Sequence, residues 1–209
     1  ENMSSKGYLT FAVSDNTNIY ASISEGFRSG GFNDASGVLN GGAPSYDPET
    51  VLSYELGVKA ILLDRRLSTE VAIYHSTYNE LQTTAVDLLS GGFSILNVAE
   101  AEIKGVELSI QWMPTSNISL GFSGNVTDAE VTKVSVTPSA KIEGDPLDLV
   151  PEYGFSLNTD FNFEWSNSVS GLFRVEYNHQ GKNSISNRTT GWAQPIAHSN
   201  PIGFLNANI

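Results

Sequence analysis

The side chains that most often carry out chemistry are few in this chain, and their spacing matches no catalytic or metal-binding pattern. The histidines His75, His179 and His198 stand far apart and lack the short spacing of metal ligands. Residues 121–124 read GFSG, which lacks the complete Gly-x-Ser-x-Gly form of a nucleophile elbow. The glycine pair at residues 30–31 precedes no helical pattern, so it is not a phosphate-binding loop. The sequence therefore predicts no enzyme, no metal centre and no cofactor.

Three carboxylates form the best candidate for a cation site. Glu143, Asp145 and Asp148 lie close together in the sequence, and hard cations such as Ca²⁺ bind carboxylate oxygens. Their spacing matches no calcium-binding loop. The favoured interpretation is that they are solvated carboxylates in a surface connection.

Ligand binding is a better-supported role for a few other side chains. The guanidinium of Arg28, beside flexible glycines, could hold an anionic ligand or pair with a carboxylate of the same protein. Tyr74 and Tyr78 share the polar face of one predicted strand and could line a vestibule. Trp192 lies in a long polar connection, where it could contact a substrate or pack within the loop. We predict that the ligand-binding residues are Arg28, Asn33, Tyr74, Tyr78 and Trp192.

These candidates must be positioned by β-strands, because apolar and polar residues alternate along most of the chain. From Tyr153 to Trp165 the odd positions are aromatic, apolar or threonine, and the even positions are polar or glycine. Successive side chains of a strand point to opposite faces, so one face of this segment is apolar. The same reasoning predicts nine strands, at about residues 6–13, 18–27, 49–60, 67–80, 100–113, 117–128, 153–165, 168–180 and 204–209.

The connections between these strands are alternately short and long. The long ones are residues 28–48, 81–99, 129–150 and 181–202, and Gly91-Gly92 is predicted to turn a hairpin within the second. Outer-membrane β-barrels have short turns on one rim and long loops on the other. Strands of about 9–13 residues also suit a tilted span of a bilayer. The pattern favours a membrane barrel over the alternative, a soluble β-sandwich.

Composition excludes some classes of protein. The 209 residues carry a net charge of −12, which argues against binding a nucleic-acid backbone, and no cysteine is present. No apolar run is long enough for a transmembrane helix. The first residues show no signal peptide, so we expect the chain to be an excerpt of a longer protein.

Charged residues give an independent check on the barrel interpretation, because they share the polar face of the strands. Arg174 on a lipid-facing position at mid-bilayer would cost about 2–4 kcal/mol, so a polar lumen is the better assignment. Lys104 is the exception, and we expect it to reach toward lipid headgroups. Trp112 and Trp165 fall on the apolar face near short turns, as in an interfacial aromatic girdle. The polar-face charges are Glu55, Lys59, Glu70, Glu107, Asp160, Arg174 and Glu176.

Several stretches resemble, in the same order, the barrel domain of TonB-dependent outer-membrane receptors. Residues 18–33 read NIYASISEGFRSGGFN, residues 46–59 contain YDPE and SYELGVK, and residues 97–108 read NVAEAEIKGVEL. A further match, at residues 144–151, runs from GD to VP. The positions that carry the resemblance include Gly26, Phe27, Gly30, Gly31, Phe32, Glu55, Gly57, Lys104, Gly105 and Glu107.

The resemblance implies an all-β, antiparallel up-and-down transmembrane barrel of about 22 strands, with a plug domain inside. Residues 1–209 would form part of that barrel domain, with the plug and the final strands outside this chain. The implied function is import of a scarce nutrient, most often a ferric siderophore, across the outer membrane of a Gram-negative bacterium. TonB would supply energy through the plug, and lipid and lipopolysaccharide would surround the barrel. A passive outer-membrane porin and a soluble β-sandwich binding domain are the alternatives.

Overall fold

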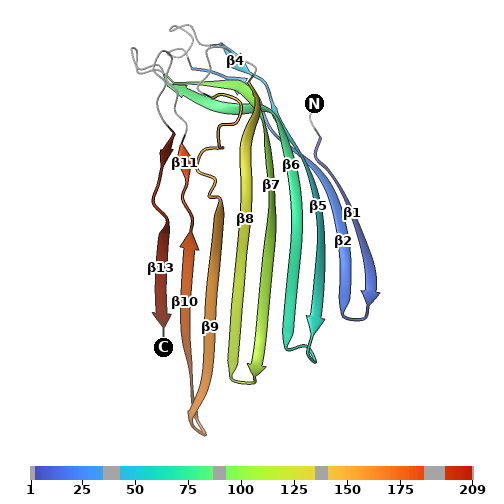
Figure 1. Cartoon of the computed structure of the whole chain (residues 1–209), viewed down its shortest axis with the longest axis vertical. Coiled ribbons are helices and arrows are strands. Elements are labelled where there is room, and N and C mark those ends of the chain that lie inside the picture. The colour runs from blue at the N-terminus through green and yellow to red at the C-terminus, as the bar shows by residue number, and fades with distance from the viewer. Residues whose placement is uncertain (1–2, 35–42, 87–92, 135–140, 186–195, 209) are drawn as a thin grey trace.

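The protein forms one curved antiparallel sheet in which each long strand pairs with its neighbours along the chain (Figure 1). The computed structural model describes residues 3–34, 43–86, 93–134, 141–185 and 196–208. No helix among these residues is long and apolar enough to cross a membrane. The nine long strands, in their order across the sheet, are β1 (Ser5–Ser14), β2 (Thr17–Arg28), β5 (Glu49–Leu62), β6 (Leu67–Val86), β7 (Phe93–Thr115), β8 (Ile118–Val134), β9 (Tyr153–Ser166), β10 (Val169–Gln180) and β13 (Ile202–Asn208).

Two small sheets lie within the long connections at the upper end of this wall (Figure 1). β3 (Gly31–Phe32) pairs with β4 (Ser45–Tyr46), and β11 (Ser184–Ile185) pairs with β12 (Ala197–His198). The short turns lie at the lower end of the wall. The predicted alternation of short and long connections is therefore confirmed.

The nine predicted strands are present, but three of them extend farther into the long connections than predicted. β8 continues to Val134, six residues into the connection predicted at 129–150. Residues 81–86 continue β6 and residues 93–99 begin β7, so most of the expected loop at 81–99 is a paired hairpin. The pairing shifts register between Tyr78 and Leu81, where Glu80 has a positive φ of 54°. This bulge interrupts the alternation, which is why the sequence pattern ends there although the pairing continues. The predicted turn at Gly91-Gly92 lies outside the described residues.

The two faces of the sheet differ as the alternation predicts. Cross-strand partners share a face, and one row runs through Leu9, Ala21, Leu56, Ile73, Val106, Val126 and Tyr153. An adjacent row on the other face runs through Thr10, Tyr20, Gly57, Ala72, Glu107, Asn125, Gly154 and Gln180. The sheet is therefore apolar on one side and mostly polar on the other.

No second layer covers the apolar face among the described residues. Leu9 is 73% exposed, Phe11 67% and Trp165 81%. A β-sandwich would bury these side chains between two sheets. The soluble-sandwich alternative is therefore wrong, and the chain forms part of a barrel wall.

The polar face is held together by ion pairs between neighbouring strands. Lys59 Nζ lies 2.8 Å from Glu70 Oε1, and the Tyr20 hydroxyl donates to the same carboxylate over 3.1 Å. Arg174 donates to both oxygens of Asp160, over 2.6 and 2.7 Å. These contacts confirm that Lys59, Glu70, Asp160 and Arg174 share one face, as predicted.

Two glycines of the polar face provide seats for tyrosine rings. A Cβ at Gly57 would lie 2.5 Å from the ring of Tyr20, and a Cβ at Gly105 would lie 2.5 Å from the Tyr74 hydroxyl. Tyr74 exchanges a 2.9 Å hydrogen bond with Thr127 on β8. The absence of a side chain at these glycines lets an aromatic ring lie flat over the next strand and protect its backbone.

Replacing Gly105 with alanine is expected to destabilise the intact protein by about 1–3 kcal/mol, because the new methyl group meets both Tyr74 and the Val126 carbonyl. The midpoint of urea unfolding in detergent measures the loss. Gly154→Ala is the control, since its methyl would lie 3.3 Å from the flexible end of Asn125. Equal unfolding midpoints for the two variants would show that packing of Tyr74 over Gly105 does not stabilise the protein.

Candidate ligand-binding rim

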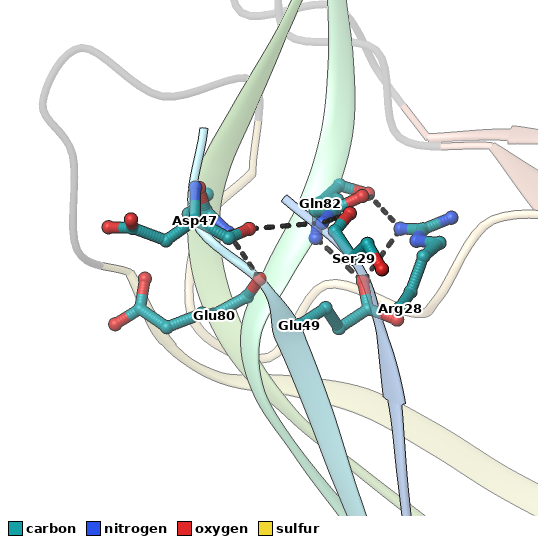
Figure 2. Close-up of polar contacts among 7 residues, drawn as sticks. Arg28, Ser29, Asp47, Glu49, Glu80 and Gln82 are labelled. Carbon is teal, nitrogen blue, oxygen red and sulfur yellow. Dashed lines mark hydrogen bonds and ion pairs between the residues drawn. The ribbon is translucent and has the colours of Figure 1, made fainter. Parts of the chain in front are cut away.

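A polar network closes the upper ends of β2, β5, β6 and β7 (Figure 2). At its centre is Glu49, the first residue of β5, which is only 9% exposed. Its carboxylate accepts a hydrogen bond from Arg28 over 2.7 Å and from the Gln82 backbone N–H over 2.7 Å. A buried carboxylate needs such partners to remain charged without a large penalty.

Gln82 ties this carboxylate to the neighbouring connection. Its carbonyl accepts a 3.1 Å hydrogen bond from Arg28. Its side-chain amide donates to the carbonyls of Ser29 and Asp47, over 3.1 and 3.0 Å. One residue of β6 therefore fixes both ends of the connection between β2 and β5.

Two asparagines extend the network by pairing with backbone groups, as a neighbouring strand would. Asn97 of β7 accepts from the Asp47 N–H over 2.7 Å and donates to the carbonyls of Asp47 and Glu80. Asn33 accepts from the Ile95 N–H over 2.7 Å and donates to the Ile95 carbonyl over 2.9 Å. We call this set the rim staple: Arg28, Asn33, Glu49, Gln82 and Asn97.

Some of the predicted ligand-binding residues already bond or pack against other parts of the protein. Of the two roles considered for Arg28, the structure shows the pairing with a carboxylate, although the side chain remains 58% exposed. Asn33 belongs to the staple, and Tyr74 is seated on Gly105. Trp192 lies outside the described residues.

Tyr78, the remaining candidate, lies on the polar face of β6 near the upper end of the strand and is half-buried. Its phenolic hydroxyl can donate a hydrogen bond.

Sequence reasoning missed Glu49 and Gln82. Glu49 begins one predicted strand, and Arg28 follows the end of the strand before it. Antiparallel pairing of these two strands places Arg28 opposite Glu49, so the ion pair could have been predicted from the sequence. Gln82 fell in the segment expected to be a loop. Only the pairing of β6 with β7 beyond the bulge brings it to Glu49.

A small apolar core supports the same end of the wall. Ala99 and Val131 are each 1% exposed, and the side chains packed against them are Leu81, Leu96, Val134 and Leu147. The extended hairpin of β6 and β7 is thus fixed on β8 and on the connection that follows it.

Of the three carboxylates of that connection, Glu143 is exposed, as the sequence suggested, but Asp145 and Asp148 have partners within the protein. Asp145 is 2% exposed, its side chain accepts a 3.0 Å hydrogen bond from the Ile142 N–H, and Asp148 pairs with Lys141. The described residues contain no group of three histidines or carboxylates placed to hold a metal ion. The connection is an internally bonded loop.

The histidines do not converge on a site. His75 lies 3.5 Å from Glu102 on the apolar face, and His198 shares a 2.9 Å hydrogen bond with Ser184. His179 stacks on the ring of Phe155, with centroids 5.1 Å apart. The three histidines therefore have separate partners on separate parts of the sheet.

Comparison with known proteins matches nearly the whole chain to one protein family. A family model described as "TonB dependent receptor-like, beta-barrel" matches residues 1–208. The "Probable TonB-dependent siderophore receptor PiuA" of Acinetobacter baumannii is 31% identical over 131 residues, which are 60% of this chain and 17% of the relative. The "Pesticin receptor" of Yersinia enterocolitica is 27% identical over 175 residues, which are 83% of this chain and 22% of the relative.

A solved structure shows the same fold. The ferric yersiniabactin uptake receptor FyuA from Yersinia pestis superposes with a TM-score of 0.76 at 18% identity, over 97% of this chain and 28% of that chain. The chain spans about a fifth of the length of the two curated relatives.

Removing the centre of the rim staple is expected to loosen the connection between β2 and β5. Glu49→Ala removes the carboxylate that accepts from the Gln82 N–H and leaves Arg28 with the Gln82 carbonyl as its acceptor, so we expect limited proteolysis within residues 29–48 to become about tenfold faster. Glu164→Ala, near the lower end of β9, is the control. Unchanged cleavage in Glu49→Ala would show that the staple does not hold this segment.

Proposed function

This chain belongs to the TonB-dependent receptor-like β-barrel family, and we propose that it is part of the barrel wall of an outer-membrane receptor that imports a ferric siderophore. The family consists of transport receptors and not of enzymes. The observation that carries the proposal is a single curved sheet with an uncovered apolar face and an ion-paired polar face, matched by the family along its length.

The names of the relatives support the ligand class. One curated relative is named as a siderophore receptor, and a structural neighbour is an uptake receptor for ferric yersiniabactin. Because the chain spans only part of these proteins, activity of the whole receptor is a proposal here.

The proposed orientation places the apolar face in the hydrocarbon of a Gram-negative outer membrane, among lipid and lipopolysaccharide. The ion pairs of Lys59 with Glu70 and of Arg174 with Asp160 would then face the lumen, where water and opposite charges compensate them. Trp112 and Trp165 would lie near the inner interface, as amphipathic aromatic rings do.

The edges of the sheet support a larger barrel. β1 and β13 each pair with a single neighbour in the sheet. Unpaired backbone groups on their outer edges would cost several kcal/mol each in hydrocarbon. Residues 1–209 would therefore be a partial barrel domain, completed by further strands and by a plug through which TonB delivers energy.

The ligand would enter from the side of the long connections. Tyr78 would donate its phenolic hydroxyl to the ligand, and the exposed part of Arg28 would attract its negative charge. Asn33 and Tyr74 would act by fixing the wall around them. Trp192 would add an aromatic contact from the fourth long connection.

Energy dependence separates this proposal from a passive porin. Deleting TonB is expected to abolish uptake of radiolabelled ferric siderophore through the whole receptor, while binding at the cell surface persists. Uptake that is equal with and without TonB would favour a passive channel. A receptor-deletion strain gives the background for both measurements.

Tyr78→Ala in the whole receptor is expected to weaken ferric siderophore binding about tenfold, through loss of one buried hydrogen bond and a ring contact. Binding to intact cells measures the effect. The matched control is Tyr54→Ala, which removes a tyrosine from the apolar face of β5. A ligand role for Tyr78 also requires that proteolysis of residues 29–48 is unchanged in Tyr78→Ala.

A further inference from the structure

The turn between β5 and β6, at the lower end of the wall, carries two adjacent arginines, Arg65 and Arg66 (Figure 1). In the described part of the chain the other lysines and arginines pair with a carboxylate, apart from Lys6. The chain has a net charge of −12, so carboxylates are in excess. Two neighbouring cations without such a partner point to a ligand from outside the chain.

The two guanidinium groups keep most of their hydrogen-bond donors for such a ligand. Arg66 Nε donates to the Leu63 carbonyl over 3.3 Å, and the Arg66 carbonyl accepts from the Met113 N–H over 2.7 Å. The first bond uses one of the five N–H donors of a guanidinium. Both arginines are exposed, and the described residues give the Arg65 side chain no hydrogen bond or ion pair.

The backbone of this turn makes arginine a costly choice. Leu63, Asp64 and Arg65 have positive φ angles of 53°, 53° and 68°. Glycine and asparagine adopt this left-handed conformation at lower cost than long side chains do. A turn that only reversed the chain would be more stable with one of them at residue 65. The arginine therefore indicates a role for the side chain beyond the turn itself.

Apolar side chains lie directly beside the arginines. Leu62, Leu67 and Trp112 form the last cross-strand row of the apolar face before the turn. Leu62 and Trp112 are each 42% exposed. The hydrogen bond between Arg66 and Met113 holds the turn next to Trp112. The turn thus combines an apolar surface with positive charge at its lower margin.

We propose that Arg65 and Arg66 bind the phosphate of phosphatidylglycerol, an anionic phospholipid, whose acyl chains lie along the row of Leu62, Leu67 and Trp112. This inference rests on the proposed function only for its orientation, with the apolar face toward lipid and the short turns toward the inner leaflet of the membrane.

The net charge of the turn selects the headgroup. Asp64 offsets one of the two arginines, so the turn carries one net positive charge. A phosphatidylglycerol headgroup carries one negative charge, and guanidinium groups donate to its phosphate oxygens in a forked geometry. Phosphatidylethanolamine has the same phosphate, but its ammonium group is repelled by the arginines. One net charge near an anionic lipid corresponds to about a fivefold preference.

The position of the charge favours a lipid over a soluble anion. The other short turns, at residues 15–16, 116–117 and 167–168, contain no lysine or arginine. Positive charge at this end of the described wall is therefore concentrated in one turn. Inorganic phosphate would satisfy the arginines but would gain nothing from the apolar row beside them.

Native mass spectrometry of the intact receptor tests the proposal, with phosphatidylglycerol and phosphatidylethanolamine offered in equal amounts. Phosphatidylglycerol is expected to be retained about fivefold better. Arg65→Asn removes the charge while asparagine tolerates the positive φ, and it should abolish this preference. The matched control is Lys6→Gln on the polar face of β1, which also removes one positive charge and should leave the preference unchanged. Trp112→Ala should lower retention of both lipids equally.

An unchanged preference in Arg65→Asn would overturn the arginine site, and a preference for phosphatidylethanolamine would overturn the headgroup assignment. Unchanged retention in Trp112→Ala would overturn the acyl contact. Displacement of phosphatidylglycerol by millimolar inorganic phosphate would show that the turn binds phosphate and not lipid. A heat-shift on gel electrophoresis identifies any arginine variant that fails to fold, in which case Arg66→Gln replaces it.

Membrane fractionation separates this inference from the proposed function. A receptor absent from the outer membrane refutes the proposed function. A receptor present there without a preference for phosphatidylglycerol refutes only the lipid site.

Discussion

Pairing of backbone hydrogen bonds within a single layer is the constraint on which the rest of this structure depends. Each inner strand of the sheet has a neighbour on both sides, so backbone donors and acceptors are satisfied without a second layer. The sheet consequently needs no core. Among the described residues the buried apolar side chains are few, and Ala99 and Val131 lie beyond the apolar rows, at the upper end. An uncovered apolar face is then a surface for lipid and not a defect in packing.

The same rule explains the rim. Where β2 and β5 end, side chains take over the role of strand partners: Asn97 and Asn33 each bond both backbone groups of one residue. Glu49 gathers Arg28 and the Gln82 N–H in a buried position. Arg28, Asn33, Glu49 and Asn97, which belong to the stretches that resemble the family, therefore hold the wall together. Residues that determine ligand specificity are therefore to be sought among side chains that do not form the hydrogen bonds and ion pairs of the rim staple.

Glycines take part in the packing of both faces of the wall. On the polar face, Gly57 and Gly105 leave room for the rings of Tyr20 and Tyr74, which reach across to neighbouring strands. On the apolar face, the ring of Phe163 lies over Gly171 on the paired strand, and the ring of Phe122 lies 3.0 Å from where a Cβ of Gly124 would stand. Aromatic rings that cover glycines in this way stiffen the sheet.

The sequence by itself determined the strands, their faces and the family, because alternation with a period of two depends only on the order of residues. It placed Lys59, Glu70, Asp160 and Arg174 on one face without any knowledge of their partners. Only the tertiary structure decided that Arg28 is held by Glu49 and Gln82, and that residues 81–86 continue β6. Those features depend on register across several strands and on a bulge at Glu80. Contacts between residues that are distant in the chain do not show in the alternation of apolar and polar residues, so the sequence pattern could not predict them.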